Sequence, residues 1–155
     1  MCVAMEHKPD NRCELQTACC GESGIMLQSK LVKTAKARER EGHDLDDEGL
    51  NERTRVLEEL CALWAGSNRV VIADLYFGLV QTANELCKIG LCFTGIVKMA
   101  TRQFPMHELQ LQQLNNQGDH KSMWSTTTDT AKPDLMTFAW VDRERRHFVS
   151  LCSNL

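Results

Sequence analysis

Apolar residues near the start of the chain come in two short runs with turn-forming residues between them. The first run ends at Cys20 and the second opens at Ile25, and Gly21-Glu22-Ser23-Gly24 separates them. Two short strands around a glycine-containing connection are typical of a β-hairpin. We therefore expect a hairpin within residues 7–32.

Residues 33–48 have a different character because almost all of them are polar. Basic residues dominate the first half of this segment and acidic residues the second half. Such a segment buries little surface, so it is predicted to be a charged surface loop. Contact between its basic half and phosphate is the less favoured alternative.

Residues 49–65 carry the clearest helical period. The apolar side chains that share one face are Leu50, Leu57, Leu60, Cys61 and Trp64. This spacing predicts an amphipathic helix. Asp46 and Asp47 are candidates to cap its start, and Gly66-Ser67-Asn68 should end it.

The segment from residue 70 to residue 99 predicts a β-α-β unit. Residues 70–77 and 91–99 are short apolar runs, as expected for buried strands. Residues 79–89 have helical spacing between them, and their inward positions are Val80, Ala83, Leu86 and Cys87. The two strands should be parallel, with a right-handed crossover. The helix and this unit together make up residues 49–104.

The last third of the chain predicts a short helix, a loop and a second hairpin. The helix should cover residues 105–114, with Pro105 at its first helical position. Residues 115–134 are polar and rich in turn formers, which favours a loop. Residues 135–152 contain two apolar runs around a charged centre and predict a hairpin. The whole order indicates an α/β domain with a mixed sheet.

Composition limits the class of protein. The chain has 155 residues, 43% of them hydrophobic, and a formal net charge of −3. This length fits one domain. The slightly negative net charge argues against a domain that coats nucleic acid, although it does not exclude a nuclease. No run of apolar residues approaches the ~20 that a membrane-spanning helix needs. The start of the chain has no signal-peptide pattern.

The eight cysteines do not form a metal-binding pattern. Structural zinc needs paired ligands, usually as C-x-x-C, and the chain has no such pair. No histidine spacing suggests a cysteine nucleophile, and no glycine-rich phosphate loop is present. We interpret Cys61, Cys87 and Cys92 as core residues because they occupy apolar positions.

Asp74 is a carboxylate at the end of an apolar strand. In open α/β folds, the carboxyl end of a strand faces the usual ligand crevice, and a carboxylate there is a good ligand for Mg²⁺. The alternative is that Asp74 caps the helix that begins at Leu79. Periodicity alone does not choose between the two.

Motifs around Asp74 resemble a known family. The run Val70-Val71-Ile72-Ala73-Asp74-Leu75-Tyr76-Phe77-Gly78 is similar to the Asp-[Ser/Asn]-[Trp/Tyr]-Phe motif of piggyBac-type transposases. Further similar blocks follow in the family's order: Lys8-Pro9, Ser23-Gly24-Ile25-Met26-Leu27, Lys88-Ile89-Gly90-Leu91, Phe93-Thr94-Gly95-Ile96-Val97-Lys98, Phe104-Pro105 and Val149-Ser150-Leu151-Cys152-Ser153-Asn154. The resemblance spans about residues 7–155, and the order and spacing of its blocks make it fairly specific.

The resemblance implies a ribonuclease H-like catalytic domain that cuts and joins DNA with Mg²⁺. Asp74 matches the second of the family's metal-binding aspartates, so the resemblance makes it a catalytic and metal-binding residue. Lys98 and Arg102 would contact DNA phosphates, although ordinary surface cations are an equally good interpretation. The family also implies a nuclear location and a possible homo-oligomer.

The sequence departs from the family pattern at three points. The first catalytic aspartate belongs to a strand before Lys8-Pro9, and we expect that strand to be absent. The last aspartate is expected beyond residue 155, and Leu75 replaces a small polar residue. One carboxylate does not hold two Mg²⁺ ions in a reactive geometry. We therefore expect no strand transfer or hydrolysis by this chain alone.

The fold class expected from the resemblance is an incomplete ribonuclease H-like mixed sheet with a C-terminal β-hairpin insertion. Its first central strand would be missing, which predicts marginal folding and aggregation through exposed strand edges. The leading hypothesis for residues 1–155 is a partial, inactive transposase catalytic domain. The runner-up is a non-catalytic module that binds DNA or protein. A third is a small intact metal-dependent nuclease.

Overall fold

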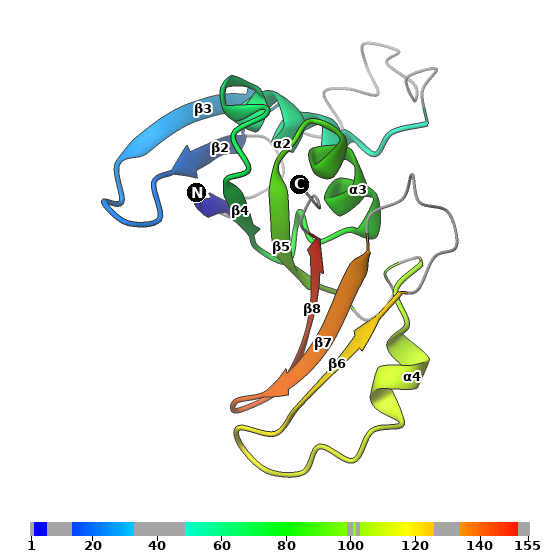
Figure 1. Cartoon of the computed structure of the whole chain (residues 1–155). Helices are drawn as coiled ribbons and strands as arrows, with labels where there is room; N and C mark the ends of the chain where they lie inside the picture. The colour runs from blue at the N-terminus through cyan, green and yellow to red at the C-terminus, as the bar shows by residue number, and fades with distance from the viewer. Residues whose placement is uncertain are drawn as a thin grey trace, which may run out of the picture.

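The computed structural model describes residues 2–5, 14–32, 49–98, 101, 103–125 and 134–151. These residues form one eight-stranded mixed sheet with the order β3-β2-β1-β4-β5-β8-β7-β6 (Figure 1). The strands are β1 (Cys2–Met5), β2 (Glu14–Cys19), β3 (Met26–Val32), β4 (Val70–Ala73), β5 (Cys92–Val97), β6 (His120–Trp124), β7 (Leu135–Val141) and β8 (Arg145–Leu151). The helices are α2 (Glu52–Cys61), α3 (Val80–Lys88) and α4 (Met106–Gln110), and a 3₁₀ turn, η1 (Ala62–Trp64), follows α2.

The predicted N-terminal hairpin is present as β2 and β3, which pair antiparallel. Its turn is closed by two backbone hydrogen bonds, from the Cys20 N–H to the Ile25 carbonyl (2.8 Å) and from the Gly24 N–H to the Cys20 carbonyl (2.9 Å). The predicted charged loop over 33–48 lies outside the described residues.

The expectation of a missing central strand is wrong. Strand β1 lies between β2 and β4, antiparallel to β2 and parallel to β4. Val3 is opposite Ala18 on one side and opposite Ala73 on the other. Four residues are enough to continue the hydrogen-bonded ladder, and so short a run gives too little periodicity to be recognised in the sequence. The predicted gap between two halves of the sheet, with its unpaired edges, is therefore not present.

The predicted β-α-β unit is present as β4, α3 and β5, and its two strands are parallel. Strand β4 ends earlier than predicted, at Ala73, because residues 75–77 form a turn. Helix α3 ends before Gly90, whose φ of +73° is a conformation that glycine adopts without steric cost. Of the four predicted inward residues, Val80, Ala83 and Leu86 are buried, and Cys87 is partly buried.

Helix α2 buries the face that its spacing predicts, with Leu57, Leu60 and Cys61 fully inaccessible. Its start differs from the prediction, because Asn51 is the N-cap and accepts a 3.0 Å hydrogen bond from the Arg53 N–H. The predicted caps, Asp46 and Asp47, lie outside the described residues.

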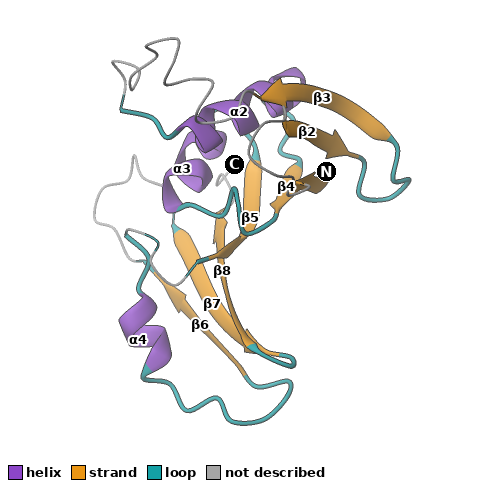
Figure 2. Cartoon of the chain, turned by 180° about the vertical axis from the view of Figure 1, so that it is seen from behind, coloured by secondary structure: helices purple, strands orange, loops and turns teal. Residues whose placement is uncertain are grey.

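Helices α2 and α3 lie on the same face of the sheet (Figure 2). Helix α2 packs against β2 and β3, and α3 packs against β5 and β8. The core between the helices and the strands is made by Val56, Leu57, Leu60, Val71, Phe77, Ala83, Leu86, Leu91, Phe93 and Leu151, among others. No helix among the described residues is long and apolar enough to cross a membrane.

The C-terminal region is an antiparallel meander of β6, β7 and β8, joined to β5 through β8. The predicted hairpin is confirmed as β7 and β8, but the loop predicted for 115–134 contains β6. Strand β6 shows no alternating apolar pattern because nearly all of its residues are exposed. Helix α4 is shorter than predicted, and Pro105 is its N-cap rather than its first helical residue.

Candidate functional site

Asp74 directly follows β4, at the edge of the sheet where three parallel strands end. The last residue of β4, Ala73, lies between Val3 of β1 and Gly95 of β5. Because β1, β4 and β5 are parallel, their carboxyl ends meet at one edge, which is where open α/β folds bind ligands. Asp74 is partly buried there.

The Asp74 side chain organises the turn that follows it. Its Oδ1 atom accepts a 2.9 Å hydrogen bond from the Tyr76 N–H, and its carbonyl accepts one from the Phe77 N–H at 3.2 Å. This is the local turn that aspartate side chains favour. The alternative role as a helix cap is wrong, because α3 has Leu79 as its N-cap and no side-chain cap hydrogen bond.

Close backbone packing fixes this turn against β5. A Cβ atom at Gly78 would lie 1.6 Å from the Ile96 carbonyl oxygen. A Cβ at Gly95 would lie 3.3 Å from the Gly78 Cα and within 2.8 Å of the Phe93 ring. Glycine at both positions lets the turn after Asp74 lie directly on the end of β5.

The aromatic residues of the turn connect Asp74 to the helices. Phe77 is fully buried and meets the Tyr76 ring edge to face, with centroids 5.0 Å apart. The Arg53 guanidinium of α2 lies 4.4 Å from the centroid of the Tyr76 ring, and its Nη1 donates to the Tyr76 carbonyl at 3.4 Å. Arg53 of helix α2 therefore contacts Tyr76, and the Tyr76 N–H in turn donates a hydrogen bond to Asp74.

The start of α2 is itself attached to α3. Gln81 accepts a hydrogen bond from the Asn51 N–H at 3.2 Å and donates one to the Gly49 carbonyl at 3.2 Å. Sequence reasoning missed Arg53, Asn51 and Gln81 as contributors to this edge. Asparagine just before a helical run is a capping signal that was available, but contacts between residues about 20 or 30 positions apart leave no local pattern.

The other predicted site residues are only partly described. Lys98 follows β5 at the same edge as Asp74 and is exposed, whereas Arg102 lies outside the described residues. The neighbouring parallel strand, β1, has the sequence Cys2-Val3-Ala4-Met5 and contains no carboxylate. Among the described residues, no group of three or more His, Cys, Asp or Glu side chains is placed to hold a metal ion.

Cys61, Cys87 and Cys92 fit the interpretation of core residues, whereas Cys19 and Cys20 are only partly buried. Cys61 and Cys92 are buried and Cys87 is partly buried. Burial raises the pKa of the Cys61 thiol to about 12 and also raises the pKa of Cys87. A thiol with a raised pKa remains protonated and is a poor nucleophile at neutral pH.

The arrangement defines a mixed α/β domain with a carboxylate at the end of a central parallel strand. A profile of the family described as Transposase IS4 matches residues 2–155, and the chain therefore belongs to this family of DDE-type transposases. A search of curated proteins finds no match.

A solved structure has a similar fold. The chain in "Cryo-EM structure of piggyBac transposase synaptic complex with hairpin DNA" matches with a TM-score of 0.64 and 16% sequence identity. The match covers 94% of this chain and 29% of that chain. The two findings confirm the resemblance to piggyBac-type transposases that the motifs around Asp74 indicate.

Proposed function

We propose that this chain is a part of a transposase catalytic domain whose ancestral activity is metal-dependent DNA cleavage and strand transfer, with Asp74 as a metal-binding residue. The observation that carries the proposal is the position of Asp74 at the end of β4, between two parallel neighbours, in a chain that matches the family from residue 2 to residue 155.

The order of the central strands supports a ribonuclease H-like fold. In that fold the first strand lies between the hairpin and the strand that carries the second aspartate, and β1 lies between β2 and β4. The equivalent position for a first aspartate would be on β1, which has no carboxylate. We therefore propose that the strand has been retained without its metal ligand.

The described residues do not fit a complete two-Mg²⁺ centre. Two metal ions need several carboxylates around them, and the described part of this edge offers Asp74 and the cation Lys98. We propose that the chain alone binds Mg²⁺ weakly at most and does not cleave DNA. Lys98 and Arg102 remain proposed phosphate contacts, and a nuclear location and self-association remain proposals from the family.

Manganese titration tests Asp74 as a metal ligand. Mn²⁺ is a paramagnetic substitute for Mg²⁺, so it should broaden the amide NMR signals of Asp74 and Tyr76 at millimolar concentration. Asp74→Asn should abolish this broadening, whereas Asp119→Asn, which removes a carboxylate directly before β6, should not. Equal broadening in the Asp74→Asn protein would contradict the role of Asp74.

A plasmid assay tests the expected lack of cleavage. Supercoiled DNA incubated with the chain and Mg²⁺ should remain as supercoiled as DNA with the Asp74→Ala protein. Mg²⁺-dependent nicking that disappears in Asp74→Ala would overturn the proposal and favour a small intact nuclease.

A second candidate function is a non-catalytic module that binds DNA or protein. It is favoured by the continuity of the eight-stranded sheet, because β1 closes the gap that would have made folding marginal. A module of this kind should unfold in a single cooperative thermal transition as the isolated chain. A broad, non-cooperative transition would count against it.

A further inference from the structure

The meander β6–β8 has two faces of different character. On one face lie Thr137, Ala139, His147 and Val149, which are buried, and Arg145, whose guanidinium donates to the Gln110, Gln112 and Leu114 carbonyls. Helix α4 and the segment after it therefore cover this face. Register places the alternate residues on the opposite face, which no described helix covers: His120, Ser122, Trp124, Met136, Phe138, Trp140, Arg146, Phe148 and Ser150.

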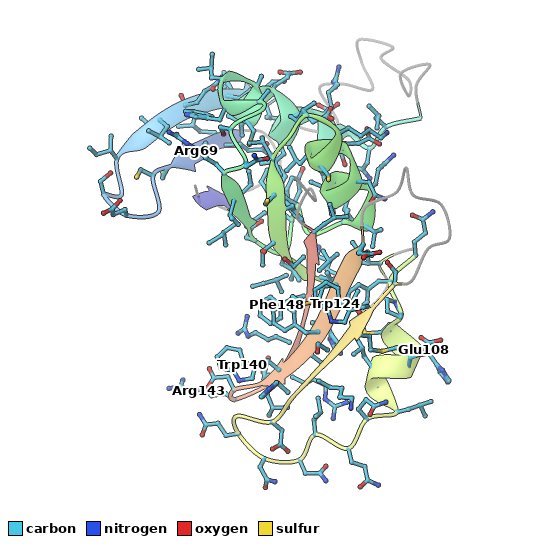
Figure 3. The ribbon with its side chains drawn as sticks, viewed as in Figure 1. Arg69, Glu108, Trp124, Trp140, Arg143 and Phe148 are labelled. Carbon is cyan, nitrogen blue, oxygen red and sulfur yellow. The ribbon has the colours of Figure 1, made fainter. Side chains whose placement is uncertain are left out.

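Aromatic rings dominate the uncovered face. Phe138 and Phe148 are direct cross-strand partners and stack with centroids 4.5 Å apart and planes 5° apart. Trp124 is 64% exposed and Trp140 is 41% exposed, both unusual values for tryptophan in a folded domain. Figure 3 shows Trp140 and Phe148 on the side of the meander away from Glu108 of α4.

Register places the two tryptophans on either side of the Phe138–Phe148 pair. Trp124 is opposite Met136, and Trp140 lies four positions further along β7. At about 3.4 Å per residue the two indoles are separated by about 14 Å along the strands. The phenylalanine pair lies at the register position between them, so the four rings follow one another along this face, and we call them the aromatic strip.

The positive charge beside the aromatic strip is complementary to phosphate. Arg146 is the direct cross-strand partner of Trp140, and His120 is the partner of Trp140 on the other side. None of the strand residues on this face is Asp or Glu. The acidic residues Asp142 and Glu144 lie with Arg143 at the β7–β8 turn, beyond the strands. A surface that packs against an aliphatic peptide would not need this combination of rings and a guanidinium.

On β2, β3 and β4 the same face exposes several aliphatic side chains, which makes a useful contrast. Leu15, Leu31, Val70 and Ile72 are exposed there, at 53%, 64%, 43% and 51%. Aliphatic side chains favour contact with other apolar side chains, whereas aromatic rings on an open sheet, with a cation beside them, are the kind of surface on which unpaired nucleic-acid bases stack.

We propose that the aromatic strip binds unpaired nucleotides of DNA by base stacking, with Arg146 contacting a phosphate or stacking beside Trp140. Trp124, Phe138, Phe148 and Trp140 would provide room for two or three bases, as in other sheet surfaces that bind single strands. The proposal rests on the proposed function in taking DNA as the partner, but it does not depend on Asp74 or on any metal ion. The stacking site and the metal site can therefore fail separately.

Intrinsic tryptophan fluorescence tests the proposal without a variant. Titration of the 155-residue chain with a twelve-nucleotide oligothymidine at low salt should quench the emission and protect the indoles from acrylamide. A blunt duplex of the same length should do neither, because its bases are paired. Because few cations lie on the strip, the affinity should fall only weakly with salt, with a slope near that of one or two phosphate contacts.

Substitutions separate stacking from general apolar contact. Trp140→Leu should weaken binding of the labelled oligonucleotide about tenfold, whereas Trp140→Phe should retain most of it, because a ring remains. Ile72→Ser, on the aliphatic part of the same face, is the matched control and should leave binding unchanged. Circular dichroism of each variant establishes that it is folded.

Three results would overturn the proposal. One is the absence of quenching by the single strand at 100-fold molar excess. Another is equal binding by Trp140→Leu and Trp140→Phe, which would indicate an apolar contact such as a polypeptide segment. The last is a concentration-dependent dimer in sedimentation that protects the tryptophans without DNA, which would make the strip an interface between copies of the chain.

Discussion

The central part of the sheet and the C-terminal meander differ in how far other elements cover them. The central strands lie beneath α2 and α3, and the core between them is fully inaccessible at Leu57 of α2, Leu86 of α3 and Phe93 of β5. The meander is covered on one face by the five-residue α4 and its following segment, with α3 packed against β8, and it exposes two tryptophans on the other face. A well-covered region can hold a carboxylate in a fixed position, whereas an open one can present rings to a partner.

The two regions are joined by one ladder. Strand β5 pairs with β8 from Phe93 opposite Leu151 to Val97 opposite His147, and the Thr94 and Ser150 hydroxyls are 2.9 Å apart across it. The same strand β5 receives the turn after Asp74 through Gly78. Strand β5 therefore supports both the candidate site and the meander.

Gly78→Ala should have the largest effect, because it separates the Asp74 turn from β5. Its Cβ would lie 1.6 Å from the Ile96 carbonyl oxygen, which is a backbone atom. We expect a loss of about 4 kcal/mol or more in the free energy of unfolding, or failure to fold. Chemical denaturation measures this loss. Gly24→Ala is the control, because its φ is +70° but it has open space, so it should lose only about 1–2 kcal/mol. If Gly78→Ala and Gly24→Ala lose the same free energy of unfolding, β5 can move away from the turn.

Arg145→Met should loosen the meander and leave the central sheet intact. Arg145 donates to three carbonyls at and after the end of α4, at 3.0 to 3.4 Å. Removing these charged hydrogen bonds should cost about 2 kcal/mol. Hydrogen exchange should become faster in α4 and β6 but remain unchanged in α2 and α3. Arg143→Met, at the exposed turn, should change neither region. Faster exchange throughout the chain would show that the two regions unfold as one unit.

Arg53→Met should act on the candidate site with a smaller effect on stability. It removes the contact with the Tyr76 ring and the hydrogen bond to the Tyr76 carbonyl, at a cost of about 1 kcal/mol. The Tyr76 amide, which donates to Asp74, should exchange with solvent faster. Arg55→Met, which removes an ion pair with Glu52 on the same helix, should leave that amide unchanged. An unchanged Tyr76 amide in Arg53→Met would remove Arg53 from the support of the site.

The smallest effect should be a pH dependence that originates in the meander. His147 is buried, and its burial, together with nearby Arg145, lowers its pKa below the ordinary value of 6.5. As the pH falls through 6.5, the unfolded chain takes up this proton before the folded chain does, so folded stability should decrease. Above 6.5 this contribution should be fully present. Melting temperatures at pH 5 and pH 8 should differ more for the natural chain than for His147→Gln. If the two proteins show the same difference in melting temperature, the pH dependence arises from other groups.

The sequence by itself determined the elements that carry strong local patterns. Helix α2, the β4-α3-β5 unit and the two hairpins follow from apolar spacing and from glycine positions, because these signals act over a few residues. The same reasoning placed Asp74 at a strand end, and the neighbouring motif pointed to the transposase family that the profile match confirms.

The tertiary structure decided the features that depend on residues far apart in the chain. Strands β1 and β6 are too short or too exposed to show a period, and only their pairing with neighbouring strands defines them. The support of Asp74 by Tyr76 and Arg53 also requires the fold, as does the alignment of Trp124 and Trp140 on one face. Hydrogen-bonded pairing and packing across the sheet create these contacts, and a linear pattern does not encode them locally.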